Sequence, residues 1–304
     1  MKIQFAVVGG DKRNIALAEK LFKLGHRVKM YGFTNYERET PISCKNLKET
    51  ISEAEYIIGP TPCSHGGGLL NAPFSSSPIV IEDLFTQIRP HQTLVAGYIK
   101  PEIMTLAKSH GFHTIDMLKR EELLVLNAIP TAEGAIKIAI EETDITLHNS
   151  NMLVIGYGRI GAVLCKMLSG IGAKVSTIAK DPHRAALAGS CGYKAILFED
   201  MNSHLCEADI IFNTVPEILL DKQNMHHINK NTLIIDLASP PYGVDVNASR
   251  ESDLKVLFTN SLPGKIAPAT TADYILETLN HIIAEDTGEF LLERPQGDCN
   301  KGGR

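Results

Sequence analysis

The feature that most constrains the fold of this chain is a glycine-rich segment at residues 153–161, Leu-Val-Ile-Gly-Tyr-Gly-Arg-Ile-Gly. An apolar run precedes it and an amphipathic helical pattern follows, which is the context that a G-x-G-x-x-G dinucleotide motif requires. Gly156 permits a tight turn, Gly158 lets backbone approach a pyrophosphate, and Gly161 lets the helix pack on the strand. The phosphates then meet N–H groups at the start of the helix. The predicted ligands are Gly156, Tyr157, Gly158, Arg159, Ile160 and Gly161.

Short apolar runs alternate with helical patterns along the whole chain, which is typical of strand–helix–strand units and a mostly parallel sheet. In the first half the expected strands are Ile3–Val8, Val28–Tyr31, Tyr56–Ile58, Leu94–Ala96 and Phe112–Ile115. In the second half they are Met152–Ile155, Lys174–Ile178, Ala195–Phe198, Asp209–Phe212, Leu233–Asp236 and Val256–Thr259. The sequence therefore predicts an α/β protein with two Rossmann-like doubly wound domains, the second a full NAD(P)-binding Rossmann fold.

A helix is expected between the two series of strands, at Thr131–Leu147, with Thr131 as N-cap and Glu133 in the first turn. Its apolar residues lie nearly all round the helix, so we expect it to be buried between the domains. The expected parts are a substrate-side domain (1–128), this interdomain helix (129–148), an NADP-binding domain (149–266), a C-terminal helix packing back on the first domain (267–285) and a disordered tail (286–304).

Composition excludes several classes of protein. The 304 residues are 44% hydrophobic and 21% charged, with a net charge of -5, so no basic footprint for nucleic acid is expected. No apolar run is long enough to span a membrane, and no secretory signal is recognised, so we expect a cytoplasmic protein. No spacing suggests a metal site. The six cysteines, expected as reduced thiols, are Cys44, Cys63, Cys165, Cys191, Cys206 and Cys299.

Cofactor choice depends on the residues after the second strand of the nucleotide domain, where NAD enzymes carry an acid and NADP enzymes carry basic residues. Ala179 is expected at the strand end and Lys180 next, and Asp181-Pro182 resembles an N-cap with proline in the first helical turn. Lys180, His183 and Arg184 would then face the 2′-phosphate. We expect NADP, with NAD as the alternative.

A second glycine segment, Val8-Gly9-Gly10-Asp11, also follows a predicted strand. It lacks the later glycines of the dinucleotide motif, and Asp11 would direct a negative charge at any phosphate. We therefore expect Asp11 to cap a helix there, and no cofactor to bind.

Ligands in open α/β sheets lie beyond the carboxyl ends of the strands. In the second domain we expect cofactor contacts from Thr214, Val215, Pro216, Asp236 and Ala238, and substrate contact from Ser239. Lys265 and Glu133 are catalytic candidates, as is His65, since histidine titrates near neutrality. Further substrate-binding candidates are Lys100, Arg120 and Thr131. For each lysine taken alone, a solvated surface position is the favoured interpretation. Glu133 can equally be a carboxylate that favours the helix dipole.

From about Ile3 to Ala284 the sequence resembles the A subunit of bacterial dipicolinate synthase. The segments that carry the resemblance are Val7–Asp11, Asn127–Ala135, Gly156–Gly161, Ile235–Ser239 and Leu262–Pro268. The layout is more distantly similar to alanine dehydrogenase and adenosylhomocysteine hydrolase. The resemblance implies NADP-dependent formation of dipicolinate from a dihydrodipicolinate-type cyclic dicarboxylate during sporulation. It also implies a heteromeric complex with the flavodoxin-like B subunit of dipicolinate synthase, and we expect the chain to self-associate as well.

The chain departs from that family at two positions. The family tends to carry Arg-Ser where this chain has Lys180-Asp181, and Arg where it has Pro240. The first change keeps a positive charge but adds an acid beside it, and the second removes a candidate carboxylate anchor. Two other functions therefore stay open: an NAD(P)-dependent dehydrogenase of a small amino or hydroxy acid, and a non-catalytic NADP(H)-sensing module.

Overall fold

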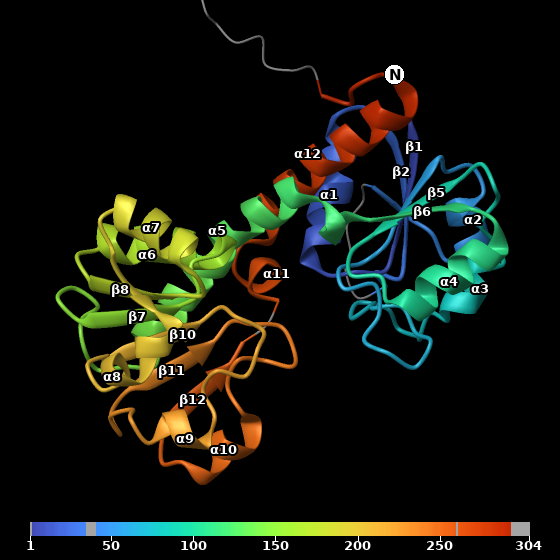
Figure 1. Cartoon of the computed structure of the whole chain (residues 1–304). Helices are drawn as coiled ribbons and strands as arrows, with labels where there is room; N and C mark the ends of the chain where they lie inside the picture. The colour runs from blue at the N-terminus through green and yellow to red at the C-terminus, as the bar shows by residue number, and fades with distance from the viewer. Residues whose placement is uncertain (1, 35–40, 260, 293–304) are drawn as a thin grey trace, which may run out of the picture. The chain divides into compact units, whose positions relative to one another are not determined.

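The computed structural model describes residues 2–34, 41–259 and 261–292. The chain forms two compact units: unit 1 comprises Met1–Leu123 with Pro268–Arg304, and unit 2 comprises Leu124–Ala267. Each unit holds one parallel sheet with helices against both faces (Figure 1). The predicted pair of Rossmann-like domains is therefore confirmed.

The sheet of unit 1 has six parallel strands in the order β3-β2-β1-β4-β5-β6. These are β1 (Gln4–Val8), β2 (Arg27–Tyr31), β3 (Ile42–Ser43), β4 (Tyr56–Ile58), β5 (Thr93–Ala96) and β6 (His113–Asp116). Five of them match predicted strands to within about a residue at each end, and only the two-residue β3 was not expected. Successive residues of β1 face opposite cores, Phe5 and Val7 on one side and Ala6 and Val8 on the other.

The helical elements of unit 1 are α1 (Lys12–Lys23), α2 (Leu47–Ile51), α3 (Ile81–Phe85), α4 (Pro101–His110), η1 (Met117–Lys119) and α12 (Pro268–Thr287). Asp11 caps α1 by accepting the amide of Arg13, as expected. Although α12 follows unit 2 in the chain, its Ile275, Leu279 and Ile283 are buried in one core with α1 and β1.

The sheet of unit 2 has the order β12-β11-β10-β7-β8-β9 and is also wholly parallel. Its strands are β7 (Asn151–Ile155), β8 (Lys174–Ala179), β9 (Lys194–Leu197), β10 (Ile210–Asn213), β11 (Leu233–Asp236) and β12 (Lys255–Phe258). All six match predicted strands to within one residue. The chain reverses direction across the sheet between β7 and β10, which is where dinucleotides bind in this architecture.

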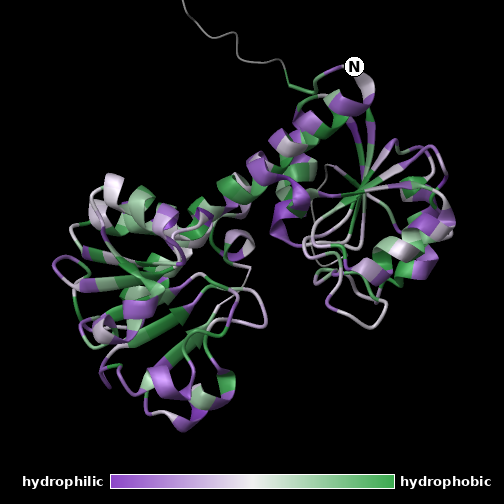
Figure 2. Ribbon diagram, viewed as in Figure 1, coloured by the Kyte–Doolittle hydropathy of each residue, from purple (hydrophilic) through white to green (hydrophobic). Residues whose placement is uncertain are grey.

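The helices of unit 2 are α6 (Arg159–Gly170), α7 (Pro182–Ser190), η2 (Phe198–Asp200), α8 (Met201–Leu205), α9 (Lys222–Met225), α10 (Val246–Glu251) and α11 (Leu262–Ile266). Hydrophobic residues gather on the central strands β10 and β11 (Figure 2). These strands are buried throughout, because helices cover both faces of a parallel sheet.

Helix α5 (Glu121–Glu141) connects the two units and differs from the predicted interdomain helix. It begins ten residues before Thr131, which is therefore not an N-cap but a mid-helix residue whose hydroxyl donates to the carbonyl of Asn127 at 2.7 Å. The helix continues through Pro130, although proline lacks the amide that would bond the preceding turn. Glu133 accordingly lies beyond the first turn, away from the helix N-terminus.

Helix α5 is buried over much of its middle, and some of its side chains remain exposed. Ala132, Ala135 and Ala139 are fully buried in the core of unit 2, whereas the Ile140 side chain is 58% exposed. By length and hydropathy α5 would be long enough to cross a membrane, a test that buried core helices also pass. Its small residues pack here as those of a core helix do.

The predicted disordered tail begins too early. Residues 286–287 end α12, and the amides of Leu291 and Leu292 donate to Oδ1 of Asn280 at 2.6 and 3.0 Å. These bonds hold the chain after α12 against the helix. The rest of the predicted tail, 293–304, lies outside the described residues.

Candidate dinucleotide site

The glycine loop of unit 2 has the local geometry that its sequence predicts. Gly156 adopts φ +97°, a conformation that favours glycine, and its amide donates to the carbonyl of Ile178 at 2.9 Å. A Cβ on Gly161 would overlap the carbonyl oxygen of Gly156, so helix α6 can approach the turn only without a side chain there. A Cβ on Gly158, in contrast, would meet no described atom within 4 Å.

The N-terminus of α6 has no capping side chain of its own. Its N-cap is Gly158, which makes no side-chain hydrogen bond to the first turn. First-turn amides have no acceptor within their own helix, so they need an outside partner. An open space over Gly158 and a twelve-residue helix without a side-chain cap fit a pyrophosphate group.

The glycine loop of unit 1 is occupied by its own chain. The amide of Gly9 donates to the carbonyl of Tyr31 at 2.9 Å, and that of Gly10 to the carbonyl of Asn71 at 2.8 Å. The Asp11 carboxylate caps α1 and forms an ion pair at 2.8 Å with the buried guanidinium of Arg13. The amides that would hold a phosphate are already used, and the nearest side chain is an acid.

At the end of β8, Asp181 is used as predicted, because its carboxylate accepts the Arg184 amide at 2.8 Å and caps α7. Lys180 is exposed, whereas Ala179 is fully buried, so only the Lys180 side chain can extend outward from this strand end. His183 is exposed in the first turn of α7. A guanidinium N–H of Arg184 donates to the carbonyl of Tyr157 at 2.9 Å, which brings this side chain onto the glycine loop.

Sequence reasoning missed one charged residue here. The carboxylate of Glu217 lies 3.3 Å from the Lys180 ammonium. Glu217 directly follows Thr214, Val215 and Pro216, the segment after β10 that was expected to contact the cofactor. The sequence signal that could have identified Glu217 was its position directly after that segment.

Several predicted cofactor residues support the loop through their side chains. The Thr214 hydroxyl donates to the carbonyl of Ile155 at 2.9 Å, and the Asp236 carboxylate is fully buried. That carboxylate accepts hydrogen bonds from the backbone amides of Ala238, Gly243 and Val244 at 2.8–2.9 Å. These polar groups are engaged inside the protein, so we assign them to positioning the strand ends.

The remaining loop residues are Tyr157, Arg159 and Ile160, and their side chains differ in exposure. The Tyr157 side chain is buried in the core of unit 2 beside Leu164 and Cys165, and burial raises the pKa of its hydroxyl. Only its backbone belongs to the loop surface. Arg159 and Ile160 begin α6, where Arg159 is exposed and Ile160 is half-buried.

The catalytic and substrate candidates of unit 2 lie on packed elements. Glu133 is exposed on α5, and the next residue, Gly134, contacts α11 so closely that a Cβ would meet Ile266 and Leu262. Lys265 is exposed on α11. The segments around Gly134 and Leu262, which carry much of the sequence resemblance, therefore pack against each other. Ser239 is exposed just after β11, whereas Asn260 lies outside the described residues.

The candidates of unit 1 lie at the carboxyl edge of its sheet. His65 is exposed at the start of a loop in which Gly66, Gly67 and Gly68 all have positive φ. Lys100 is the half-buried N-cap of α4.

Arg120, a predicted substrate-binding residue, forms ion pairs within unit 1. Its guanidinium donates to both oxygens of Glu285 at 2.6 and 2.9 Å and to Glu122 at 2.9 Å. These bonds raise the pKa of Arg120, and the guanidinium lowers the pKa of Glu285. The network ties the start of α5 to the last turns of α12.

Cysteines and metal-ligating residues supply no second centre among the residues that the structure describes. Five cysteines are free thiols, and burial raises the pKa of Cys63 and of Cys165 to about 12, which makes both poor nucleophiles. Cys299 lies outside the described residues. In the described ranges, no three His, Cys, Asp or Glu side chains gather as a metal site requires.

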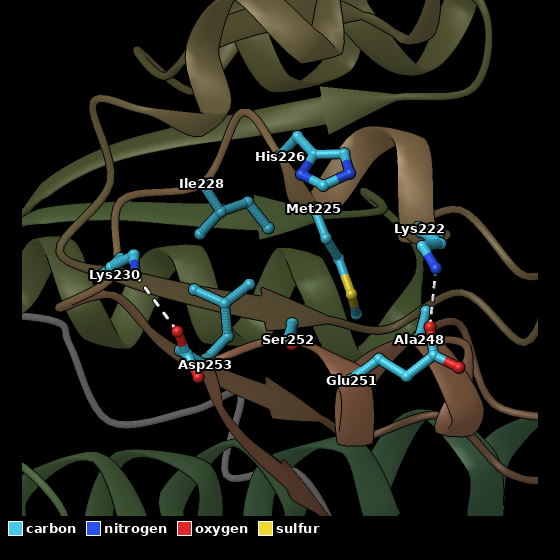
Figure 3. Close-up of a pocket in the computed structure, with 10 residues that line it drawn as sticks. Lys222, Met225, His226, Ile228, Lys230, Ala248, Glu251, Ser252 and Asp253 are labelled. Atoms are coloured by element: carbon cyan, nitrogen blue, oxygen red, sulfur yellow. Dashed lines mark hydrogen bonds and ion pairs between the residues drawn. The ribbon is translucent and has the colours of Figure 1, made fainter.

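A hollow of about 280 Å³ lies between α9 and α10 (Figure 3). Two ion pairs border it, Lys222 with Glu251 at 2.7 Å and Lys230 with Asp253 at 3.1 Å. Lys230 and Asp253 precede strands β11 and β12, so this hollow lies at the amino edge of the sheet, opposite the glycine loop. It is not part of the dinucleotide site.

In the comparison with known proteins, two separate regions of the chain match two different protein families. Residues 4–118 match the model of the N-terminal domain of the dipicolinate synthase A subunit, and residues 137–257 match shikimate / quinate 5-dehydrogenase. The dipicolinate synthase A subunit of Bacillus subtilis (strain 168) is 27% identical over 290 residues, which are 94% of this chain and 98% of the relative. The resemblance to the dipicolinate synthase A subunit is confirmed.

Solved structures agree with this assignment. The dipicolinate synthase A subunit from Bacillus subtilis, 27% identical, superposes with a TM-score of 0.85, covering 95% of this chain and 98% of that one. The A subunit from Bacillus halodurans, 25% identical, gives 0.86 over 93% and 98%. An L-alanine dehydrogenase, 15% identical, shares the fold with a TM-score of 0.65 over 94% and 91%. The relatives and the fold together support an oxidoreductase that uses a nicotinamide cofactor.

Proposed function

We propose that this chain is the dehydrogenase component that forms dipicolinate by hydride transfer from a dihydrodipicolinate-type cyclic dicarboxylate to NADP. The observation that carries the proposal is the open, uncapped glycine loop of unit 2 in a chain similar to the dipicolinate synthase A subunit along nearly its whole length. A dinucleotide fits at Gly158 and the first turn of α6.

The reaction removes two hydrogens from the ring. One leaves as a hydride to the nicotinamide, which supplies the electron acceptor when bound, and one leaves as a proton to a base. The product ring is aromatic, which drives the transfer, so the protein acts mainly by positioning and by accepting the proton. Glu133 is our proposed proton acceptor, since it is exposed on α5 one residue before the contact with α11.

Positive side chains would hold the two substrate carboxylates. Lys265 and Lys100 are the lysines proposed for this role, and Ser239 and His65 are proposed as polar residues for the substrate. Arg120 is less suited, because it already pairs with Glu285 and Glu122.

NADP is the proposed cofactor. The Asp181 carboxylate caps α7, which leaves Lys180, His183 and Arg184 as the side chains beside the position of an adenosine 2′-phosphate. The positive charges would favour that phosphate.

The relatives support a proposal for the setting of the reaction. The name of the Bacillus subtilis relative designates one subunit of a synthase, which implies a partner chain. We propose the flavodoxin-like B subunit of dipicolinate synthase as that partner, together with self-association of this chain, in the cytoplasm of a sporulating cell. A nucleotide-sensing module without turnover, or a dehydrogenase of small amino or hydroxy acids, would use the same glycine loop.

The test is dipicolinate formation from substrate generated in place by dihydrodipicolinate synthase. NADP⁺ and NAD⁺ are each supplied with and without the flavodoxin-like partner. We expect dipicolinate with NADP⁺. If a folded protein that binds NADPH forms no dipicolinate under all four conditions, the dipicolinate assignment is wrong, and the sensing module or a dehydrogenase of another substrate replaces it.

A further inference from the structure

The ion pair between Lys180 and Glu217 joins two strand ends across the glycine loop. Lys180 follows β8 and Glu217 follows the segment after β10, and both strands pair with β7. The glycine loop begins at the end of β7. An interaction between the two flanking strands therefore passes over the place where a dinucleotide enters.

The pair involves one of the charges on which the proposed NADP preference depends. The Lys180 ammonium and a Glu217 carboxylate oxygen are 3.3 Å apart, and their side chains are 72% and 63% exposed. Water screens a pair so exposed, so it opens at little cost. A 2′-phosphate that pairs with Lys180 must nevertheless displace Glu217 from the lysine. The phosphate then lies close to the Glu217 carboxylate, which is also negatively charged.

We propose that Glu217 limits how strongly this protein discriminates NADP from NAD, by competing with the 2′-phosphate for Lys180 and by repelling that phosphate. The inference rests on the proposed NADP binding and adds to it a residue that sets specificity. NAD has no 2′-phosphate, so its affinity is insensitive to the charge of Glu217.

The test is direct binding of NADPH and NADH, each followed by fluorescence titration of the full chain without substrate. In Glu217→Gln the affinity for NADPH should rise about three- to tenfold, the effect of removing one exposed ion pair and one repulsive charge. The affinity for NADH should stay within about twofold. In the double variant Glu217→Gln, Lys180→Gln the gain should disappear, because the phosphate has lost its cation.

The matched control is Glu251→Gln. Glu251 pairs with Lys222 at 2.7 Å, with side chains 72% (Lys222) and 61% (Glu251) exposed, at the opposite edge of the same sheet (Figure 3). This variant has the same charge change as Glu217→Gln and should bind both dinucleotides like the parent. Equal gains in both single variants would mean a general charge effect and would overturn the proposal.

Two further results would overturn it. Unchanged NADPH affinity in Glu217→Gln would show that the carboxylate does not compete, while the parent's preference for NADPH, and with it the proposed cofactor, would stand. Weaker NADH binding in that variant would instead assign Glu217 to the ribose hydroxyls. If the parent bound neither dinucleotide, the proposed function would itself fail, and the inference with it.

Discussion

The buried carboxylate of Asp236 accepts a hydrogen bond from the side-chain amide of Asn213 at 2.9 Å. The bond joins the carboxyl ends of β10 and β11, two neighbouring strands of unit 2. Asn213 also donates to the carbonyl of Val215, and Asp236 accepts three backbone amides of the next loop. A single buried network thus fixes both loops beside the glycine motif.

Replacing Asp236 should destabilise unit 2. In Asp236→Asn an NH2 group replaces one of the two carboxylate oxygens, so the donors that bonded to this oxygen lose their acceptor. The free energy of unfolding should therefore fall by about 3 kcal/mol. Urea denaturation measures this change in stability. The control is Asp253→Asn, whose side chain is 85% exposed and should change stability by less than about 0.5 kcal/mol. Equal effects of the two changes would contradict the assigned role.

Two alanine substitutions in the glycine loop should separate folding from binding. Gly158→Ala adds a Cβ to open space, so the protein should keep its melting temperature and lose dinucleotide affinity, because the methyl group blocks the pyrophosphate. In Gly161→Ala the added Cβ would clash with the carbonyl of Gly156 and force α6 away from the turn, so the melting temperature should fall as well. Thermal unfolding and NADPH titration distinguish them. Full NADPH affinity in Gly158→Ala would place the dinucleotide elsewhere.

The role of Glu133 as base can be checked on α5. Glu133→Gln should lower the turnover number by about a hundredfold or more, as loss of a general base does, without changing NADPH affinity. Glu141→Gln removes another exposed carboxylate of the same helix and should keep full turnover. The measurement is the initial rate at saturating NADP⁺. If Glu133→Gln folds and turns over like the parent, another group accepts the proton.

Acidification should destabilise unit 1 through His26. Burial lowers the pKa of this side chain, whose Nδ1 accepts the amide of Ile3 and whose Nε2 is buried without a described partner. The folded state thus binds fewer protons than the unfolded state, in which the imidazole has a pKa of about 6.5. His26 should therefore contribute a loss of stability as pH falls below that value. His26→Gln should show a flatter dependence in urea denaturation at about pH 7 and pH 5; an identical slope would contradict this.

Most strands were predictable because each is a short run that is rich in apolar residues and lies between helical patterns or turn residues. The two-residue β3 was not, since neither Ile42 nor Ser43 is buried. The start of α5 was misplaced for a physical reason: Pro130 and Thr131 resemble a helix boundary in sequence, yet the helix tolerates both inside it. Packing of Gly134 on α11 is consistent with a helix that continues through that point.

The candidate site could likewise be predicted only in part. The glycine turn and the Asp181 cap could be predicted, because each depends on residues adjacent in the chain. The partners of Arg120 and Lys180 could not, since Glu285 and Glu217 are distant in sequence and meet them only through the fold.

The most direct test of the proposed dehydrogenase activity is to measure NADPH and dipicolinate together as the full chain oxidises freshly generated substrate. We expect one NADPH for each dipicolinate, with a much slower reaction when NAD⁺ replaces NADP⁺. Dipicolinate that accumulates without reduction of either dinucleotide would contradict it, because the glycine loop of unit 2 would then take no part in the oxidation.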